Sequence, residues 1–246
     1  MSVEINFLGT GDAFGHGGRL QACFFIKSGQ HGLMLDCGAS AMISFQRYSV
    51  APNDVDIILV SHLHGDHFGG LPFFILDAQL HNKRTHPLTI AGPKGLSDRF
   101  IQVMEILFPK LSKIQQKFEI NVVELEPGTP WVWQNMTVDS AEVRHPSGEQ
   151  ALAFRIGLDG KTIGYTGDTE WVDGLVPLLG GVDLLIAEAY FFEKSIKFHL
   201  NYQTLVEHLP ELNPKQMVIT HMSQDMLDRL GEIDVPAAQD GMVVQL

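Results

Sequence analysis

The chain contains the stretch Ile57-Ile58-Leu59-Val60-Ser61-His62-Leu63-His64-Gly65-Asp66-His67, in which an apolar run leads directly into four candidate metal ligands. The apolar residues predict a short strand that is buried on both faces of a sheet. Imidazole binds divalent metals as the neutral base at pH 7, without the cost of burying a charge. His62 and His64 can point at one ion if the backbone between them stays extended. Asp66 and His67 can then turn toward a neighbouring ion, so this one loop is expected to serve two metals.

The length and composition of the chain favour one globular domain. The 246 residues are 45% hydrophobic, which is enough for a substantial core, and we expect residues 1–246 to form a single metallo-hydrolase domain. No segment reaches the ~18 apolar residues of a membrane span. Residues 1–8 lack the basic and apolar regions of a signal peptide. The expected location is therefore cytoplasmic, with no membrane partner.

The charge of the chain argues against a large nucleic-acid-binding face. Its formal net charge is −12 at pH 7, whereas phosphate backbones are bound by clustered Lys and Arg. A small-molecule substrate is expected instead. The net charge does not exclude a local basic pocket. The two cysteines, Cys23 and Cys37, have no zinc-like spacing and are expected to be buried thiols.

Short apolar runs alternate with helical patterns along the whole chain, which predicts an α/β fold with a strand-rich centre. The expected strands cover residues 3–8, 23–26, 33–36, 57–60, 88–91, 120–125, 136–143, 152–157, 162–165, 184–187 and 217–220. The expected helices cover residues 39–48, 68–80, 96–108, 171–179 and 202–209.

Three more candidate ligands follow predicted strands, as His62 does. His145, Asp168 and His221 each stand where the chain leaves a sheet. Alone, each is more often a turn former or a satisfied polar group. Together they supply what the first loop lacks, because two ions need about six or seven protein ligands.

These residues, in this order, resemble the motifs of the metallo-β-lactamase superfamily. The shared pattern is His-x-His-x-Asp-His, then a later His, then Gly-Asp-Thr at Gly167 to Thr169, and finally a His after the last strand. The resemblance implies a four-layer αβ/βα sandwich with a dinuclear metal site at one edge. It implies that His62, His64 and His145 hold one ion, that Asp66, His67 and His221 hold the other, and that Asp168 bridges them. The ligands favour zinc, with manganese or iron as alternatives.

Within that superfamily the chain is most similar to the ribonuclease Z and cyclic phosphodiesterase branch. The similarity rests on Leu8-Gly9-Thr10-Gly11-Asp12-Ala13-Phe14-Gly15 and on Leu88-Thr89-Ile90-Ala91-Gly92-Pro93-Lys94-Gly95. His199 resembles the extra histidine of the branch, which implies a proton donor to the leaving group or a phosphate contact. A satisfied structural histidine is the alternative. Asp66 would orient the attacking hydroxide that bridges the metals.

The chain also departs from the patterns of several relatives. Only 22 residues separate His145 from Asp168, whereas ribonuclease Z enzymes that trim transfer RNA commonly carry a long arm there. Only 25 residues follow His221, too few for the added helical domain of glyoxalase II-like thioesterases. Zinc β-lactamases use a Cys in the second metal site, whereas this chain has no Cys at the matching place. These departures favour hydrolysis of a small phosphodiester, cyclic ones included.

Two other function classes stay open: a lactone or carboxylic-ester hydrolase with the same ligands, and a non-catalytic metal-binding domain. Asp36 is expected to form a turn or to support a ligand. Trp171 and the run Tyr190-Phe191-Phe192 are expected either to form an apolar substrate wall or to pack a helix. His16 could reach the pocket from its glycine-rich loop, and apolar surface near residues 71–76 is compatible with a homodimer.

Overall fold

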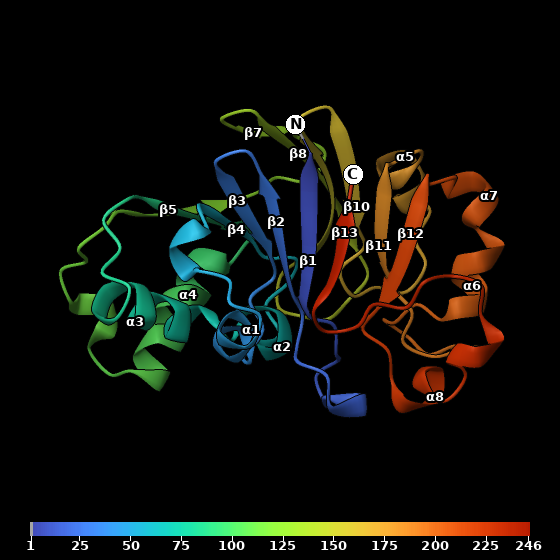
Figure 1. Ribbon diagram of the computed structural model, residues 1–246, viewed down its shortest axis with the longest axis horizontal. Coiled ribbons are helices and arrows are strands. Elements are labelled where there is room, and N and C mark those ends of the chain that lie inside the picture. The colour runs from blue at the N-terminus through green and yellow to red at the C-terminus, as the bar shows by residue number, and fades with distance from the viewer. Residues whose placement is uncertain (1) are drawn as a thin grey trace.

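The computed structural model describes residues 2–246, so Met1, the first residue of the expected domain, lies outside the described residues. Two β-sheets stand face to face in the middle of the molecule, and helices cover the outer face of each (Figure 1). The expected four-layer αβ/βα sandwich is confirmed.

The first sheet has the strand order β13-β1-β2-β3-β4-β5-β6. From β13 to β3 the neighbouring strands are antiparallel, and from β3 to β6 they are parallel. The strands are β1 (Val3–Gly9), β2 (Cys23–Ser28), β3 (His31–Leu35), β4 (Ile57–Leu59), β5 (Leu88–Gly92), β6 (Ile120–Glu124) and β13 (Met242–Gln245).

The second sheet has the order β12-β11-β10-β9-β8-β7. Its strands β12, β11 and β10 are parallel, and β10 to β7 are antiparallel. The strands are β7 (Trp131–Trp133), β8 (Met136–Val143), β9 (Ala151–Leu158), β10 (Lys161–Tyr165), β11 (Leu184–Glu188) and β12 (Gln216–Thr220).

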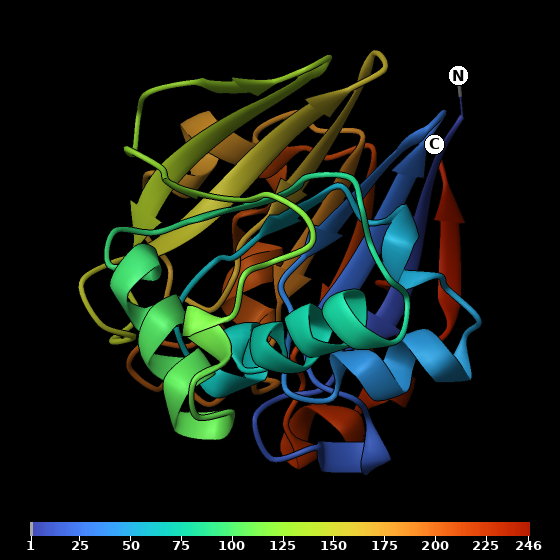
Figure 2. The same cartoon turned by 90° about the vertical axis from the view of Figure 1, so that its left-hand side faces the viewer.

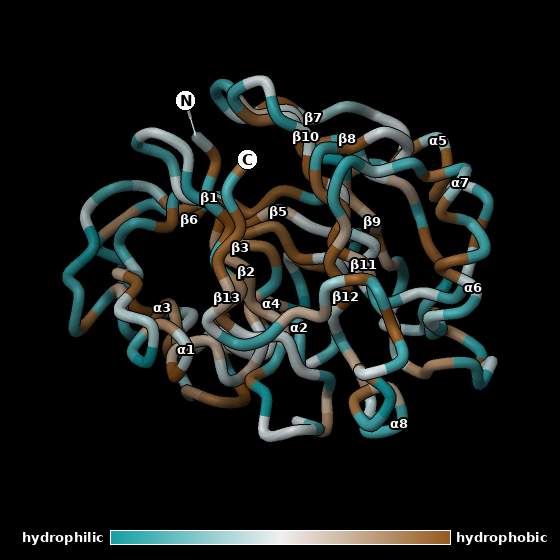
Figure 3. Tube along the Cα trace, turned by 45° about the vertical axis from the view of Figure 1, so that its right-hand side comes forward, coloured by the Kyte–Doolittle hydropathy of each residue, from teal (hydrophilic) through white to brown (hydrophobic). Residues whose placement is uncertain are grey.

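Three buried apolar clusters hold the four layers together. The central cluster joins the facing sides of the two sheets, where the ring of Phe24 in the first sheet contacts Tyr165 in the second at 5.6 Å between centroids. One outer cluster lies between the first sheet and the helices α1 (Ala41–Arg47), α2 (Gly65–Phe68), α3 (Leu71–Leu80) and α4 (Leu96–Leu107) (Figure 2). The other lies under α5 (Leu175–Leu179), α6 (Tyr202–Glu207), α7 (Leu209–Leu212) and α8 (Gln224–Leu227). The hydrophobic residues accordingly concentrate along the strands (Figure 3).

The structure corrects several element boundaries. The helix expected over residues 68–80 is two helices, because the backbone N–H of Gly70 donates to the carbonyl of Cys37 at 2.8 Å and so leaves the helical hydrogen-bond pattern. Only glycine fits there, since a Cβ on Gly70 would stand 2.2 Å from the carbonyl oxygen of Gly38. The helix expected over 171–179 is only Leu175–Leu179, and that over 202–209 ends at Glu207. The strands β7 and β13 were not expected at all.

The surface over α3 carries exposed apolar side chains. Phe73 and Leu80 are 41% and 61% exposed, whereas Leu71 is buried. The homodimer expected at this surface stays a prediction. None of the helices within residues 2–246 combines the length and the apolar character that a membrane span requires.

Candidate metal centre

The candidate ligands gather where strands of both sheets end. The loop after β4 carries His62, and those after β8, β10 and β12 carry His145, Asp168 and His221. Because the parallel strands of each sheet point the same way, their carboxyl ends meet at one edge of the sandwich. Residues far apart in the sequence therefore form one cluster.

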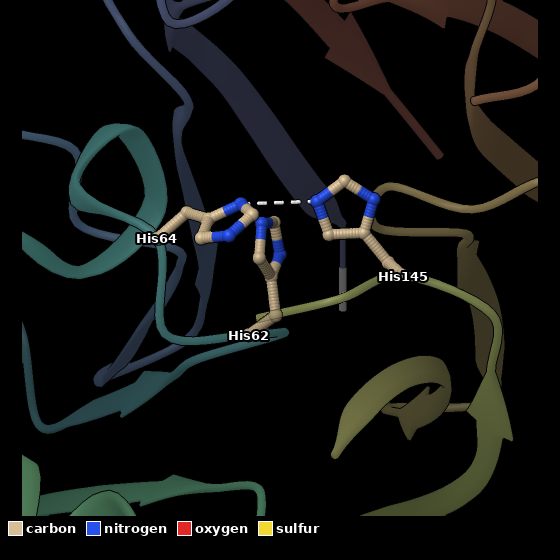
Figure 4. A group of neighbouring side chains, drawn as sticks. All are labelled: His62, His64 and His145. Atoms are coloured by element: carbon tan, nitrogen blue, oxygen red, sulfur yellow. Dashed lines mark hydrogen bonds between the residues drawn. The ribbon is translucent and has the colours of Figure 1, made fainter. Parts of the chain in front are cut away.

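The first group consists of His62, His64 and His145 (Figure 4). Each side chain offers one ring nitrogen, and these three atoms all lie within 4.8 Å of one another. His64 has the extended backbone expected for it, with φ −79° and ψ 152°. The rings of His62 and His64 therefore both turn toward His145, whose Nε2 lies 3.0 Å from Nδ1 of His64.

The second group consists of Asp66, His67, Asp168 and His221, all of them buried. Nε2 of His67 lies 3.4 Å from a carboxylate oxygen of Asp66 and 3.3 Å from one of Asp168. Nε2 of His221 lies 3.1 Å from Asp168. Asp66 and His67 belong to the short helix α2, and the ring of His67 lies 4.1 Å from that of His62 between centroids.

Asp168 lies between the two groups. The same carboxylate oxygen, Oδ2, is 3.1 Å from His221 and 3.8 Å and 3.9 Å from the Nε2 atoms of His62 and His145. The carboxylate of Asp168 is therefore within 4 Å of ring nitrogens from both groups.

The ring nitrogens that face away from the cluster are engaged by protein groups. Nε2 of His64 donates to the carbonyl of Pro146 at 3.1 Å, and Nδ1 of His145 donates to that of Phe198 at 2.9 Å. Nδ1 of His67 donates to Asp36 at 2.7 Å. In a neutral imidazole, such an outward hydrogen bond fixes the tautomer and leaves the inward nitrogen as a lone-pair donor.

The inward atoms fit a metal ion. Within residues 2–246, Nε2 of His62, Nε2 of His67 and Oδ1 of Asp168 are buried without a hydrogen-bond partner, which is costly unless another group binds them. Burial lowers the pKa of His62 well below its ordinary value and that of His145 to about 4, so both imidazoles are neutral at pH 7. Burial opposes ionisation of Asp66, yet neighbouring His67 lowers its pKa to about 2. Neutral imidazoles and ionised carboxylates are the donors that divalent metals use.

Asp36 supports a candidate ligand through hydrogen bonds, which was one of the two roles expected for it. This fully buried carboxylate accepts hydrogen bonds from Nδ1 of His67, from the hydroxyl of Tyr165 at 2.6 Å, and from the backbone N–H and hydroxyl of Ser61 at 2.7 and 2.8 Å. Its φ of 56° is unusual for a residue other than glycine. His221 shares this left-handed backbone, with φ 57°. The fold thus holds two strained residues at the centre.

His199 lies beside the second group and is paired with a residue that the sequence reasoning missed. Its Nδ1 hydrogen-bonds to Glu188, a fully buried carboxylate at the end of β11, which also accepts from the backbone N–H groups of Thr169 and Leu200 at 2.9 and 3.1 Å. Burial opposes protonation of His199, but the hydrogen bond and charge of Glu188 outweigh it and raise the pKa of the imidazole. Glu188 follows a predicted strand, as Asp168 and His221 do. This position in the sequence could have identified it as a candidate site residue.

A cavity of about 140 Å³ opens onto the cluster. Its walls include the rings of Tyr190 and Phe14. The ring of Tyr190 stacks on that of His199, with 4.6 Å between centroids. Tyr190 therefore forms part of the cavity wall, which was one of the two roles expected for this run of aromatic residues. Burial and the charge of Asp12 raise the pKa of Tyr190 to about 12, which keeps its phenol neutral.

Other residues singled out in the sequence lie elsewhere. His16 does not line the cavity; its Nδ1 lies 2.6 Å from the buried carboxylate of Asp12, which positions the glycine-rich loop. Trp171 stacks on His208 at 3.7 Å, and Phe192 is buried against Tyr202. Cys23 and Cys37 are the buried free thiols that were expected.

Comparison with known proteins places the chain in a family. A family model described as anti-Pycsar protein Apyc1 matches residues 3–236. The chain belongs to the anti-Pycsar protein Apyc1 family.

Relatives of this Apyc1-family chain include ribonuclease Z enzymes. That of Lachnoclostridium phytofermentans is 31% identical over 123 residues, a match that covers 50% of this chain but only 38% of that enzyme. That of Clostridium novyi is 25% identical over 91% of this chain and 90% of its own length.

Solved structures show the same fold. Human tRNase Z, short form, has a TM-score of 0.82 and 25% identity over 98% of both chains. The metallo-β-lactamase fold protein YhfI from Bacillus subtilis has a TM-score of 0.80 and 21% identity over the full length of both. The Apyc1-family chain is thus an enzyme of the metallo-β-lactamase superfamily, a hydrolase in the branch of ribonuclease Z and phosphodiesterases, as its motifs predicted.

Proposed function

We propose that this enzyme is a dinuclear-metal phosphodiesterase that hydrolyses a small phosphodiester. The observation that carries the proposal is the position of Asp168 between two groups of ligand atoms, with the His199–Glu188 pair beside them. In this assignment one ion is held by His62, His64 and His145 and the other by Asp66, His67 and His221, with Asp168 shared. Zinc suits this donor set best, and manganese or iron fits it too.

Two ions bound there would supply a water of lowered pKa as the nucleophile and would neutralise charge that develops on the phosphoryl oxygens. The residues of the chain do the rest. Asp66 lines the cavity, where its carboxylate can orient the attacking water and take its proton.

His199 is placed to protonate the departing oxygen. Its Nδ1 is occupied by Glu188, so Nε2 is the atom that can donate. Glu188 raises the pKa of His199 and so favours the protonated imidazole, the form that can donate from Nε2. The stacked ring of Tyr190 holds the imidazole plane in place. A leaving alkoxide is a strong base and needs such a donor.

A small substrate is supported by two features. The cavity at the cluster is only about 140 Å³. The net charge of −12 disfavours binding of an extended nucleic acid, although two relatives are named ribonuclease Z.

The test is hydrolysis of bis(p-nitrophenyl) phosphate by protein freed of metal and then supplied with zinc or manganese. We expect metal-dependent turnover, and lactones and carboxylic esters assayed beside it should be poorer substrates. A rate that does not depend on metal, or a preference for lactones, would overturn the proposal. Cleavage of precursor transfer RNA at a higher kcat/KM would overturn the assignment of a small substrate.

His199→Ala separates the proton donor from the metal ligands. p-Nitrophenolate is a weak base that leaves without a proton, whereas an alkoxide does not. We therefore expect the variant to lose about 10²- to 10⁴-fold in kcat on dialkyl phosphodiesters and far less on bis(p-nitrophenyl) phosphate. Equal losses on both substrates would assign His199 to phosphate binding instead.

A further inference from the structure

Residues 236–241, just before β13, connect the two sheets at the edge where the cluster lies. Ile219 of β12 exchanges two backbone hydrogen bonds with this segment, at 3.0 and 2.8 Å. Phe7 of β1 accepts from the N–H of Gly241 at 2.7 Å. The chain then enters β13, which pairs with β1 (Figure 1). A segment late in the chain thus contacts the ends of one strand from each sheet.

The carboxylate of Asp240, in this segment, joins both ends of the loop formed by residues 11–19. Its Oδ1 accepts from the backbone N–H and the hydroxyl of Thr10, at 2.9 and 2.8 Å, and its Oδ2 accepts from the N–H of Leu20 at 2.7 Å. The loop also closes on itself there, since the N–H of Gly11 donates to the carbonyl of Leu20 at 2.7 Å. Asp240 therefore fixes the base of the loop.

The loop that Asp240 fixes forms part of the catalytic cavity. Ala13 and Phe14, at its tip, stand in the cavity wall. Phe14 is 76% exposed, so few protein contacts hold its ring in place. The position of this part of the wall therefore depends on the base of the loop.

Thr10 connects Asp240 to a candidate metal ligand. While its N–H and hydroxyl donate to Asp240, its carbonyl accepts from the N–H of His221 at 3.2 Å and from the hydroxyl of Thr220 at 3.3 Å. The φ of 57° at His221 is costly for a residue with a Cβ and persists only where neighbouring contacts impose it. The carbonyl of Thr10 is one of these contacts.

We infer that Asp240 is a positioning residue for the catalytic centre. It orients Thr10, whose carbonyl sets the backbone from which His221 reaches the cluster, and it fixes the loop that carries Phe14. The inference rests on the proposed function, because it takes His221 as a metal ligand. It adds a carboxylate from the end of the chain to the groups on which metal binding depends.

Asp240→Asn is the decisive variant. Asparagine keeps the size of the side chain but has one acceptor oxygen, so its NH₂ group must face Thr10 or Leu20, which both present donors. We expect the affinity for zinc, measured in competition with a chromophoric chelator, to fall about tenfold or more. Hydrogen exchange at the backbone amides of Thr10 and Leu20 should accelerate about tenfold or more, because each loses a charged acceptor.

Asp183→Asn is the matched control. Asp183 accepts from the N–H and the hydroxyl of Thr162 at 2.8 and 3.0 Å, the same pair of donors that Asp240 receives from a threonine. It stands just before β11, at the end of that strand opposite Glu188. This variant should lose stability in denaturant unfolding and still bind zinc as the wild type does.

A second pair of variants tests the path through Thr10. Thr10→Val removes the hydroxyl at constant size and should lower zinc affinity about threefold or more. Thr10→Ser keeps the hydroxyl and should bind zinc like the wild type. These variants keep the inference falsifiable if Asp240→Asn does not fold.

Wild-type zinc affinity in Asp240→Asn would overturn the inference. An equal loss of affinity in Asp183→Asn would also overturn it, since the effect would then be one of general stability. Equal affinities of Thr10→Val and Thr10→Ser would contradict the path through Thr10. If the wild-type protein binds zinc but does not hydrolyse bis(p-nitrophenyl) phosphate, the proposed function fails, and the zinc competition still decides the role of Asp240.

Discussion

Replacing Glu170 with alanine should weaken metal binding, although Glu170 is not a candidate ligand. Its carboxylate accepts from the backbone N–H of Phe198 at 2.8 Å and from Arg144 at 2.8 Å. Phe198 has a left-handed backbone, with φ 72°, and its carbonyl accepts from Nδ1 of His145 at 2.9 Å. Glu170 therefore holds the peptide that orients a candidate ligand.

The magnitude follows from two terms. A left-handed backbone costs about 1–2 kcal/mol for a residue with a Cβ. The hydrogen bond to a charged carboxylate contributes about 1.5–3 kcal/mol, which is enough to offset that strain at Phe198. Without Glu170 the peptide relaxes and His145 loses the carbonyl that fixes its ring. Loss of such a partner typically lowers metal affinity 10- to 100-fold.

Competition for zinc against a chromophoric chelator measures this change. Phe198→Gly should restore affinity in the Glu170→Ala background, because glycine adopts a positive φ without strain. Glu149→Ala is the control, since Glu149 is an exposed glutamate in an ion pair with Lys94 at 2.9 Å. The reasoning is wrong if Glu170→Ala binds zinc as tightly as wild type, or if the glycine leaves the defect unchanged while the protein stays folded.

Three further predictions concern buried carboxylates and one ion pair. Asp36→Asn should lower zinc affinity about 10- to 100-fold, since His67 loses its charged partner; unchanged affinity in the same chelator assay would contradict this. Asp168→Ala should lower bound metal, measured by elemental analysis, and abolish hydrolysis; full metal content with normal turnover would exclude a bridging role. The hydrogen bond of Asp183 with Lys215 lowers the pKa of this carboxylate to about 2. A depressed pKa in the folded state stabilises the fold above about pH 4 and is lost as pH falls toward 2, so Asp183→Asn should cost about 1 kcal/mol at pH 7 and almost nothing at pH 2 in denaturant unfolding.

Much of the fold could be predicted because its strands are apolar and short. β4 is apolar throughout, and the buried residues of β11 and β12 are apolar up to the last one, so the position of these strands and their carboxyl ends were clear from the sequence. The strands β7 and β13 were missed because they are three and four residues long and alternate between partly buried and exposed positions. The pairing of β13 with β1 joins Glu4 to Gln245, a contact that no local pattern encodes.

The candidate ligands were predictable for the same reason that the strands were, since each follows the end of one. The groups that orient them were not. The contact of His145 with Phe198 depends on a left-handed residue in a distant loop, and that of His199 with Glu188 on a loop that folds back onto the end of β11. Tertiary contacts of this kind arise from the way the loops pack, so only the structure reveals them.

The cluster takes its members from both sheets: His62 and His67 follow a strand of the first, and His145, Asp168 and His221 follow strands of the second. An ion held there cross-links the two halves of the sandwich, much as a disulfide would, and binds only after both halves have formed. Metal binding is then part of the free energy of folding, so removing the metal loosens the seam between the sheets.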